Sequence, residues 1–152
     1  MEGYLEDWHV GDRYQTYPRV ITGTDVDLFT SLTGIRAPLF LNEEYARELG
    51  FKTRITPGLL IMPLAIGGLY QLGLFDNLIA WMGFDKVKFN ASVCPGDAVR
   101  SVIEVIQKRE TKREDRGLII CKLMIQKENN ETVSEGELTF LCRRKSGEDC
   151  SL

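Results

Sequence analysis

The sequence predicts an α+β fold in which an antiparallel sheet wraps around one long apolar helix. Two observations indicate this fold. The segment between Arg54 and Asp76 contains no charged residue and is apolar on every side of a helical projection. Beyond Asn77 the pattern becomes strand-like, with β-favouring segments separated by turn residues. Because a helix that is apolar all round needs cover on several sides, we expect the sheet to supply that cover.

Length, composition and charge limit the classes of function. The 152 residues, 43% hydrophobic and 27% charged, fit one hydrophobic core and match neither a disordered chain nor a disulfide scaffold. We expect one domain over residues 1–145 and a disordered tail over residues 146–152. The 22 acidic residues outnumber the 19 Lys and Arg, and the net charge of −3 argues against a nucleic-acid binder.

The charge-free segment is not expected to span a membrane. A bilayer needs about 20 consecutive apolar residues, whereas Pro57, Pro63 and several glycines interrupt this run. A short helix that is apolar all round is typical of the interior of a protein. The start of the chain, MEGYLEDWHVGD, is acidic and lacks the apolar stretch of a secretory signal, so we expect a cytoplasmic protein.

The chain up to Gly34 is predicted as a strand followed by a short amphipathic helix. Residues 12–22 are polar and β-favouring, which fits a strand. Thr24-Asp25 is expected to cap the helix VDLFTSLTG, and Gly34 to end it. The apolar face of this helix consists of residues at spacings of three, namely Val26, Phe29 and Leu32.

The next elements lead to the central helix. The segment IRAPLF, around Pro38, is predicted as an irregular connector. Residues 42–49 form a helix that is capped by its asparagine, has acidic residues in its first turn and ends at Gly50. Thr56 and Pro57 then open the apolar helix, since proline is tolerated in a first turn.

Four strands are predicted after Asn77. Pro95-Gly96 separates the first two, and Asn129-Asn130, a dipeptide suited to positive φ, joins the last two. A curved antiparallel sheet around one apolar helix is the hot-dog arrangement. Because it leaves a sheet edge and a helix flank exposed, we expect a dimer with the sheets side by side. The strand segments are residues 85–93, 95–110, 117–127 and 131–145.

Histidine and cysteine usage limits the chemistry further. His9 is the one histidine of the chain. The four cysteines are scattered singly with no C-x-x-C pair, so we expect no metal site. Cys94, Cys121 and Cys142 are expected to be packing residues in a reducing compartment, and Cys150 falls in the tail.

Three segments follow one another along the chain: TDVDLFTSLTG running into APLFLNEEYA, then ITPGLLIMPLAIGGL, then VKFNASVCPGDAVR. Together they resemble the MaoC-like or (R)-specific enoyl-CoA hydratases of the hot-dog fold. The first is similar to the family's overhanging helix, glycine-centred loop and following helix. The second is similar to the start of the central helix, and the third to a strand ending in a Pro-Gly-Asp turn. The resemblance spans roughly residues 12–127.

The resemblance implies a specific site. In that family an aspartate and a histidine activate a water that adds to a trans-2-enoyl thioester, while a backbone N–H at the central helix stabilises the enolate-like oxygen. Neither the aspartate nor the histidine is retained here. Isoleucine and phenylalanine stand at their positions, and neither side chain can donate or accept a proton. The histidine before the family's central-helix glycine is Pro57. The family's glycine, aspartate, proline, histidine and oxyanion glycine fall on Gly34, Ile35, Pro38, Phe40 and Gly58.

Other polar residues are candidates for the altered site. Arg36 is a candidate for binding a carboxylate or a CoA phosphate, with a solvent-facing arginine as the alternative. Thr56 lies near the cap of the central helix, and Asn90 points either into the site or outward. Asp25 and Asp27 are expected to cap and complement the N-terminus of their helix.

Two further segments bear on the function. The run from Lys108 to Arg116 mixes both signs of charge, which favours a solvated hairpin, with a contact to CoA phosphates as the alternative. The central helix has no acidic residue from Gly58 to Phe75, which argues against a thioesterase. Tyr70, late in that helix, is expected to pack with its hydroxyl satisfied.

The expected function is therefore an acyl-CoA-binding relative of the hydratases with a divergent site. Gly58 provides the oxyanion contact, and no cofactor is expected beyond the CoA or acyl-carrier thioester itself. The alternatives are a non-catalytic subunit that pairs with an active MaoC-like partner, and an acyl-CoA thioesterase. We expect a homodimer or a hetero-oligomer with another hot-dog subunit. The predicted apolar pocket consists of Ile35, Pro38, Phe40 and Leu59.

Overall fold

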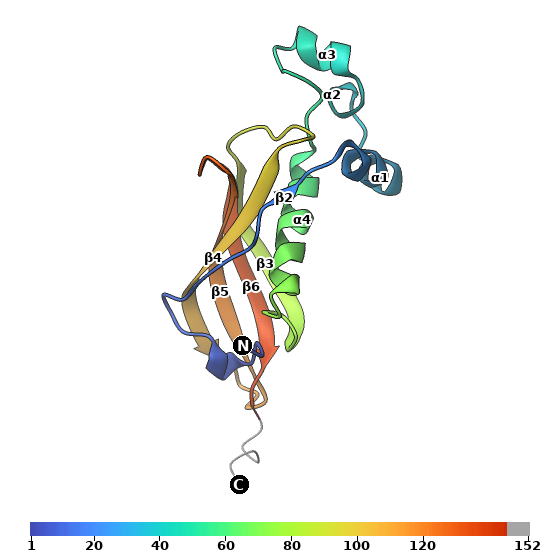
Figure 1. Ribbon diagram of the computed structural model, residues 1–152. Coiled ribbons are helices and arrows are strands. Elements are labelled where there is room, and N and C mark those ends of the chain that lie inside the picture. The colour runs from blue at the N-terminus through green and yellow to red at the C-terminus, as the bar shows by residue number, and fades with distance from the viewer. Residues whose placement is uncertain (146–152) are drawn as a thin grey trace.

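The structure is a computed structural model that describes residues 1–145 (Figure 1). The described chain forms one six-stranded antiparallel sheet with a long helix on one face, as predicted. The tail predicted over residues 146–152 lies outside the described residues. The elements are η1 Leu5–Asp7, β1 Arg13–Gln15, β2 Arg19–Val20, α1 Gly23–Thr33, α2 Pro38–Leu41, α3 Glu43–Glu48, α4 Gly58–Gln71, β3 Leu78–Phe89, β4 Ala98–Glu110, β5 Arg116–Lys127 and β6 Thr132–Arg143.

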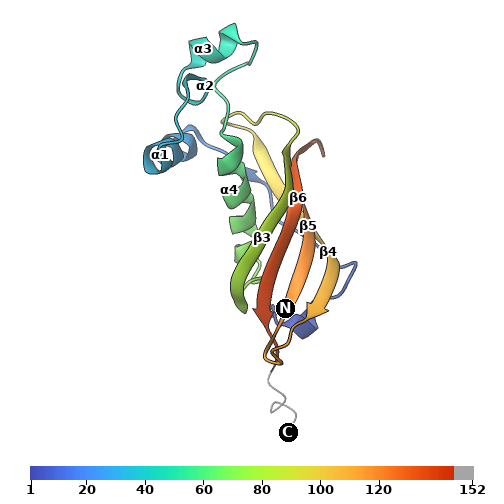
Figure 2. The same ribbon diagram turned by 180° about the vertical axis from the view of Figure 1, so that it is seen from behind.

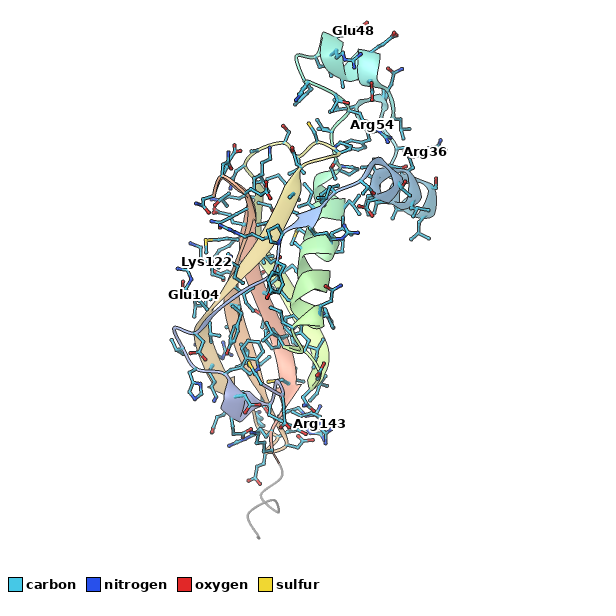
Figure 3. The ribbon with its side chains drawn as sticks, viewed as in Figure 1. Arg36, Glu48, Arg54, Glu104, Lys122 and Arg143 are labelled. Atoms are coloured by element: carbon cyan, nitrogen blue, oxygen red, sulfur yellow. The ribbon has the colours of Figure 1, made fainter. Side chains whose placement is uncertain are left out.

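The strand order across the sheet is β1-β4-β5-β6-β3, and β2 also pairs with β4. Every pairing is antiparallel. Glu104 and Lys122 are cross-strand partners of opposite charge on the face of the sheet away from α4 (Figure 3). Neighbouring residues on these strands, such as Ile103 and Leu123, are fully buried. The alternation fits a sheet with one solvated face and one covered face.

Helix α4 supplies the helical half of the core. It begins at Gly58, so Pro57 is the N-cap and lies one residue before the first turn in which it was predicted. Leu59, Pro63 and Tyr70 form an exposed stripe along α4. The sheet of the same chain therefore covers only the opposite side of the helix. Within residues 1–145, no helix is long and apolar enough to cross a membrane. The buried side chains of α4 are Leu60, Ile61, Met62, Ala65, Ile66 and Leu69.

One buried hydroxyl group, that of Ser101, attaches α4 to the sheet, and a second, that of Thr16, joins the segment after β1 to β4. Ser101 Oγ donates a hydrogen bond to the carbonyl oxygen of Ala65 at 2.7 Å. The N–H of Ser101 donates to Thr16 Oγ1 at 2.9 Å. Gly68 permits this close approach, because a Cβ there would lie 3.0 Å from Thr16 Cγ2. The bonds satisfy polar groups that would otherwise be buried at a cost, and the Ser101–Ala65 bond holds the helix to the sheet.

Two predictions for the first 25 residues are corrected. The strand predicted over residues 12–22 is split into β1 and β2, because Pro18 has no N–H to donate to the ladder. The cap of α1 is Thr22 and not Thr24-Asp25. Thr22 Oγ1 accepts from the N–H of Asp25 at 3.0 Å, and the Asp25 carboxylate accepts from the N–H of Thr22 at 2.9 Å. With this reciprocal pair α1 begins at Gly23, three residues before the predicted start at Val26.

The segment from Gly23 to Leu49, here called the overhang, stands beyond the N-terminal end of α4 and away from the sheet (Figure 1). Gly34 ends α1 with a φ of 73°, as predicted. The connector predicted around Pro38 is instead a one-turn helix, α2, which proline at its first position favours. Asn42 caps α3 with its side-chain oxygen, as predicted. On α1, Leu32 was predicted on the apolar face but is 87% exposed.

The strand after α4 is longer than predicted. Strand β3 begins at Leu78, whereas the pattern indicated a strand from Asp85 onward. It pairs with β6 alone and forms one edge of the sheet, next to α4 in the view of Figure 2. The turn between β5 and β6 contains Asn130 at a φ of 66°, which confirms the predicted turn.

Candidate functional site

A groove of about 560 Å³ lies where the overhang, the start of α4 and the end of β3 meet. Its volume is within the range of small-molecule sites, about 300–1,000 Å³. The wall is mostly apolar. The lining residues are Leu39, Phe40, Phe51, Ile55, Thr56, Gly58, Leu59, Ile61, Phe89, Asn90, Ala91, Ser92 and Val93.

The start of α4 presents backbone donors to this groove. The carbonyl of Pro57 accepts from the N–H groups of Leu60 and Ile61, and Pro57 has no side-chain cap to offer. In the described part of the chain, the N–H groups of Gly58 and Leu59 have no acceptor. Free N–H groups at the positive end of a helix dipole suit an oxygen that carries negative charge.

The side chain of Phe89, on β3, packs closely against Gly58. A Cβ at position 58 would lie 2.7 Å from Phe89 Cδ1, which real Cβ atoms do not do. The Phe89 ring therefore lies against the first residue of α4. Because Phe89 is half exposed at the end of an edge strand, its ring can move without opening the core.

Thr56 forms the polar part of the groove beside Gly58. Its N–H donates to the carbonyl of Val93 at 2.7 Å, which holds the segment before α4 against the loop after β3. Its side chain is buried, at 3% exposure, and Oγ1 has no hydrogen-bond partner within the described residues. Such a group is uncommon in folded proteins.

Arg54 fixes the overhang above the groove, a role that the sequence did not reveal. Its Nη1 donates to Asp27 Oδ1 at 2.6 Å and to the carbonyl of Phe40 at 3.3 Å, and its Nη2 donates to the carbonyl of Gly23 at 3.3 Å. The guanidinium holds the pKa of the Asp27 carboxyl below its usual 3.8. A second bond, from the Ile55 N–H to the Leu39 carbonyl at 3.2 Å, joins the same two segments.

The residues of this chain that line the groove offer hydrogen-bond donors and acceptors. Of the residues that line it, none has a titratable side chain. The polar groups are the hydroxyls of Thr56 and Ser92, the amide of Asn90 and the free backbone N–H groups. General acid–base catalysis needs a group that exchanges a proton within hydrogen-bond reach of the reacting atom. The lining of the groove can bind and orient a ligand that has an apolar part and an oxygen that accepts hydrogen bonds.

The structure brings together four of the predicted binding residues, Phe40, Thr56, Gly58 and Leu59, and Asn90 joins them. Three other predicted positions, Ile35, Arg36 and Pro38, are not among the lining residues. Arg36 is exposed on the overhang beside α1 (Figure 3). The residues that sequence reasoning missed are large and apolar, chiefly Phe51, Ile55 and Phe89, and their pattern alone is that of ordinary core positions.

The other candidates have structural roles. Asp25 completes the α1 cap and pairs with Arg19, at 3.1 Å between Oδ1 and Nη2. Within this chain the hairpin of residues 108–116 lies at the end of the sheet opposite to the start of α4 (Figure 1). The hydroxyl of Tyr70 accepts a hydrogen bond from Trp81 Nε1 at 2.9 Å, as predicted for a satisfied tyrosine, although its side chain is partly exposed.

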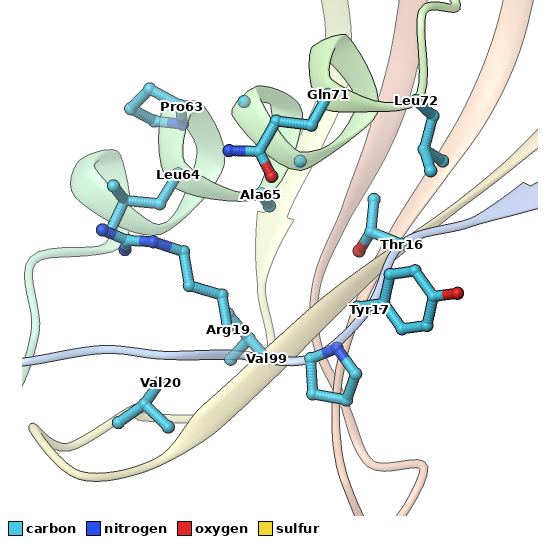
Figure 4. Close-up of a pocket in the computed structure, with 13 residues that line it drawn as sticks. Thr16, Tyr17, Arg19, Val20, Pro63, Leu64, Ala65, Gln71, Leu72 and Val99 are labelled. Atoms are coloured by element: carbon cyan, nitrogen blue, oxygen red, sulfur yellow. The ribbon is translucent and has the colours of Figure 1, made fainter.

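A larger pocket of about 840 Å³ lies between the β1–β2 segment and the outer side of α4 (Figure 4). Arg19 and Gln71 reach toward it, and Tyr17 lines it. Arg19 is already paired with Asp25, and the N-terminus of α4 is not part of this pocket. The groove beside Gly58 is therefore the better candidate, because free donors converge there. Across residues 1–145, no three His, Cys, Asp or Glu side chains are grouped to hold a metal ion.

Comparison with known sequences identifies the family to which the chain is similar. The family model described as "MaoC like domain" matches residues 7–120. A beta-methylmalyl-CoA dehydratase of Chloroflexus aurantiacus is 32% identical over 117 residues, which cover 76% of this chain and 33% of that protein. The chain thus spans about a third of that relative. A 3-hydroxybutyryl-CoA dehydratase of Methylorubrum extorquens is 30% identical over 154 residues, which cover 96% of this chain and 88% of that protein.

Solved structures give the same fold. A monoamine oxidase regulatory protein from Archaeoglobus fulgius superposes with a TM-score of 0.86 at 28% identity, covering 94% of this chain and 95% of the other. A Mycobacterium tuberculosis protein with a double hot-dog fold superposes with a TM-score of 0.85 at 16% identity, covering 97% of this chain and 46% of the other. The second likeness is one of fold, and it confirms the predicted hot-dog architecture.

Proposed function

This chain belongs to the MaoC-like domain family, and on that premise we propose that it binds an acyl-CoA thioester in the groove at the start of α4. The site differs from the family pattern, because Ile35 and Phe40 stand where the resemblance places the aspartate and the histidine. The ligand is held and oriented, and the residues of the groove add no water to it. A thioester on an acyl-carrier protein presents the same reactive group.

One observation carries this proposal: free backbone donors at a helix N-terminus open into an apolar groove whose lining contains no titratable side chain. The N–H groups of Gly58 and Leu59 suit a carbonyl oxygen, and Phe40, Phe51 and Ile61 provide an apolar surface for an acyl chain. Without an acid or a base beside it, a bound thioester keeps its bond. The same absence argues against thioester hydrolysis by this chain.

The relatives support the ligand class. Two of them are named as dehydratases of CoA thioesters, a beta-methylmalyl-CoA and a 3-hydroxybutyryl-CoA. These names describe those proteins. For this chain the proposal is the class of acyl-CoA thioesters, without a particular acyl group. The exposed Arg36 lies outside the lining, so we do not assign it to a ligand carboxylate.

Calorimetric titration with butyryl-CoA tests the proposal. We expect saturable binding that Ser92→Trp weakens by about tenfold or more, because an indole at this exposed lining position fills the groove. Ser31→Trp is the matched control, since Ser31 is exposed on α1 outside the groove. Absence of binding to butyryl-CoA and to longer acyl-CoAs, or equal binding by Ser92→Trp and wild type, contradicts the proposal.

A second candidate function is that of a subunit that pairs with an active MaoC-like partner. The observation that favours it is the exposed apolar surface of edge strand β3, where Met82, Phe84 and Phe89 are each about half exposed. Unpaired backbone groups and apolar side chains on one edge suit another sheet, either of a second copy or of a related hot-dog chain.

Sedimentation and co-expression separate these two assemblies. A homodimer in the purified protein that Met82→Lys dissociates supports self-pairing through β3. A monomer that gains a stable partner, and changes the hydratase rate or chain-length preference of a co-expressed MaoC-like enzyme, supports the paired subunit. A Met82→Lys protein that assembles like wild type in both experiments contradicts the use of this edge.

A further inference from the structure

The Thr56 hydroxyl stands out because nothing in the described chain uses it. Among residues 1–145, two buried side-chain polar atoms lack a hydrogen-bond partner, Thr56 Oγ1 and Arg100 Nε. Arg100 still donates through Nη2 to Asn130. Oγ1 is the one polar atom of the Thr56 side chain, so this side chain makes no hydrogen bond although the residue is only 3% exposed. A valine of the same shape would avoid this cost.

The position of the hydroxyl suggests what it binds. Thr56 lies two residues before Gly58 and lines the same groove, and its backbone is held by the 2.7 Å bond to the Val93 carbonyl. The adjacent free groups, the N–H of Gly58 and that of Leu59, are donors only. A ligand atom that meets all three must accept hydrogen bonds. A hydroxyl rotates freely, so it can add a third donor to the same oxygen.

We infer that the Thr56 hydroxyl binds the carbonyl oxygen of the acyl thioester, beside the free N–H groups at the start of α4. This inference rests on the proposed function, because it names the ligand atom that the groove holds. It adds a side-chain contact to a site otherwise made of backbone donors. It also gives a reason for a threonine at a buried position where an apolar residue would pack equally well.

Shielding of the hydroxyl is consistent with this role. Oγ1 is closed to bulk water in the unliganded protein, so the hydrogen bond with the ligand does not compete with solvent. The Phe89 ring lies against Gly58 at the same place and is half exposed on the edge strand. Its displacement by the ligand would open the start of α4 without disturbing the core.

The test compares two ligands that differ in one atom. Butyryl-CoA carries the thioester carbonyl, and S-butyl-CoA, its thioether analogue, does not. We expect wild type to bind butyryl-CoA more tightly than S-butyl-CoA, and Thr56→Val to reduce this preference by about threefold to tenfold, the value of one neutral hydrogen bond. Thr56→Ser keeps the hydroxyl and keeps the preference. Affinity for S-butyl-CoA is the same in all three proteins.

Thermal unfolding without ligand provides an independent readout. If the hydroxyl is unpaired, Thr56→Val melts at or above the temperature of wild type. Thr30→Val is the matched control, because Thr30 is also buried but its Oγ1 donates to the Asp27 carbonyl at 3.1 Å, so its loss lowers the melting temperature. A Thr56→Val protein that loses as much stability as Thr30→Val has lost a partner within the fold, which overturns the inference.

The failure of this inference is distinguishable from that of the proposed function. If wild type binds both analogues and Thr56→Val weakens both equally or neither, Thr56 does not bind the carbonyl, and the proposed function stands. If wild type binds neither analogue, the proposed function fails and the inference fails with it.

Discussion

The guanidinium of Arg54 joins the overhang to the start of α4 through Asp27, with 2.6 Å between Nη1 and Oδ1. The two residues are 27 positions apart, and Arg54 also holds the carbonyls of Gly23 and Phe40. The Arg54 side chain is 17% exposed, although Asp27 is largely in solvent. This contact sets one wall of the groove, because Phe40 belongs both to α2 and to the lining.

Arg54→Ala is expected to loosen the overhang while leaving the sheet intact. Three hydrogen bonds are lost at once, so amide exchange over residues 23–49 is expected to rise by about tenfold or more. Exchange in β4, β5 and β6 is expected to stay unchanged, because these strands pair with one another in the core. Hydrogen exchange followed by mass spectrometry measures both regions in one experiment.

Arg47→Ala is the control for Arg54. Arg47 pairs with Glu43 at 3.1 Å on the exposed surface of α3, and such pairs contribute little. If Arg47→Ala and Arg54→Ala alter exchange equally, the Arg54 contact has no special role in positioning the overhang.

Gly58→Ala is expected to displace the half-exposed Phe89 ring and to destabilise the protein by about 1 kcal/mol, the lower end of the usual cost of overpacking. The added Cβ would lie 2.7 Å from the Phe89 ring. Combining it with Phe89→Ala removes the clash, so the effects of the two substitutions should be non-additive. Chemical denaturation of the two single variants and the double variant measures this coupling.

Gly67→Ala is the matched control on the same helix. A Cβ at Gly67 meets no atom within 4 Å, and alanine favours a helix interior by about 1 kcal/mol over glycine. The variant is therefore expected to be as stable as wild type or more so. A Gly58→Ala protein that gains stability as Gly67→Ala does would show that Phe89 does not pack on Gly58.

The thiols of Cys121 and Cys142 are expected to resist modification in the native protein. Burial raises the pKa of each from about 9 to about 12, so the reactive thiolate is scarce at neutral pH. In a Cys94→Ser, Cys150→Ser background, the reaction with Ellman's reagent at pH 8 is expected only upon unfolding. Rapid modification of the native variant would show that these side chains are accessible.

The same shift predicts the pH dependence of stability. The folded pKa of the two thiols lies above the unfolded value, so the folded state holds these protons more tightly. Their contribution to stability is complete below about pH 9 and is lost as the pH rises from 9 toward 12. Replacing both with alanine should flatten this part of the stability curve. An unchanged alkaline slope would contradict the assignment.

Ile35→Asp combined with Phe40→His is expected to create hydration of crotonyl-CoA. General acid–base groups contribute about 10²–10⁴-fold to rate, so a gain of about 10²-fold over wild type is expected if both groups reach the water. Phe40 lines the groove, whereas Ile35 lies outside the lining. The single variant Phe40→His therefore tests whether a histidine placed in the groove is enough for hydration. A folded double variant without activity counts against the register of this loop.

The fold could be predicted from the sequence because residue types at a few positions strongly favour one local conformation. The apolar helix from Gly58 to Gln71, the left-handed Gly34 and the Asn130 turn all follow from residue type and position. The helical turn after Pro38 and the early start of β3 at Leu78 were not predicted, because in each place nearby residues favour more than one conformation.

The site could be predicted only in part. Gly58 and Phe40 were identified from the resemblance to the family, Thr56 was identified from its place near the cap of the central helix, and all three line one groove. Arg54 and Phe89 were not identified, because their roles depend on contacts with Asp27 and Gly58 that only the folded chain creates. The unpaired state of the Thr56 hydroxyl is likewise a property of packing.

The most direct test of the account is mass spectrometry of the purified protein incubated with crotonyl-CoA and with butyryl-CoA. The account predicts a complex in which each ligand is recovered with its thioester intact and with no added water beyond the buffer control. Hydration of crotonyl-CoA by wild type would contradict it, because a groove without titratable side chains would then have supplied an acid and a base. Release of free CoA, or no complex with either ligand, would contradict it as well.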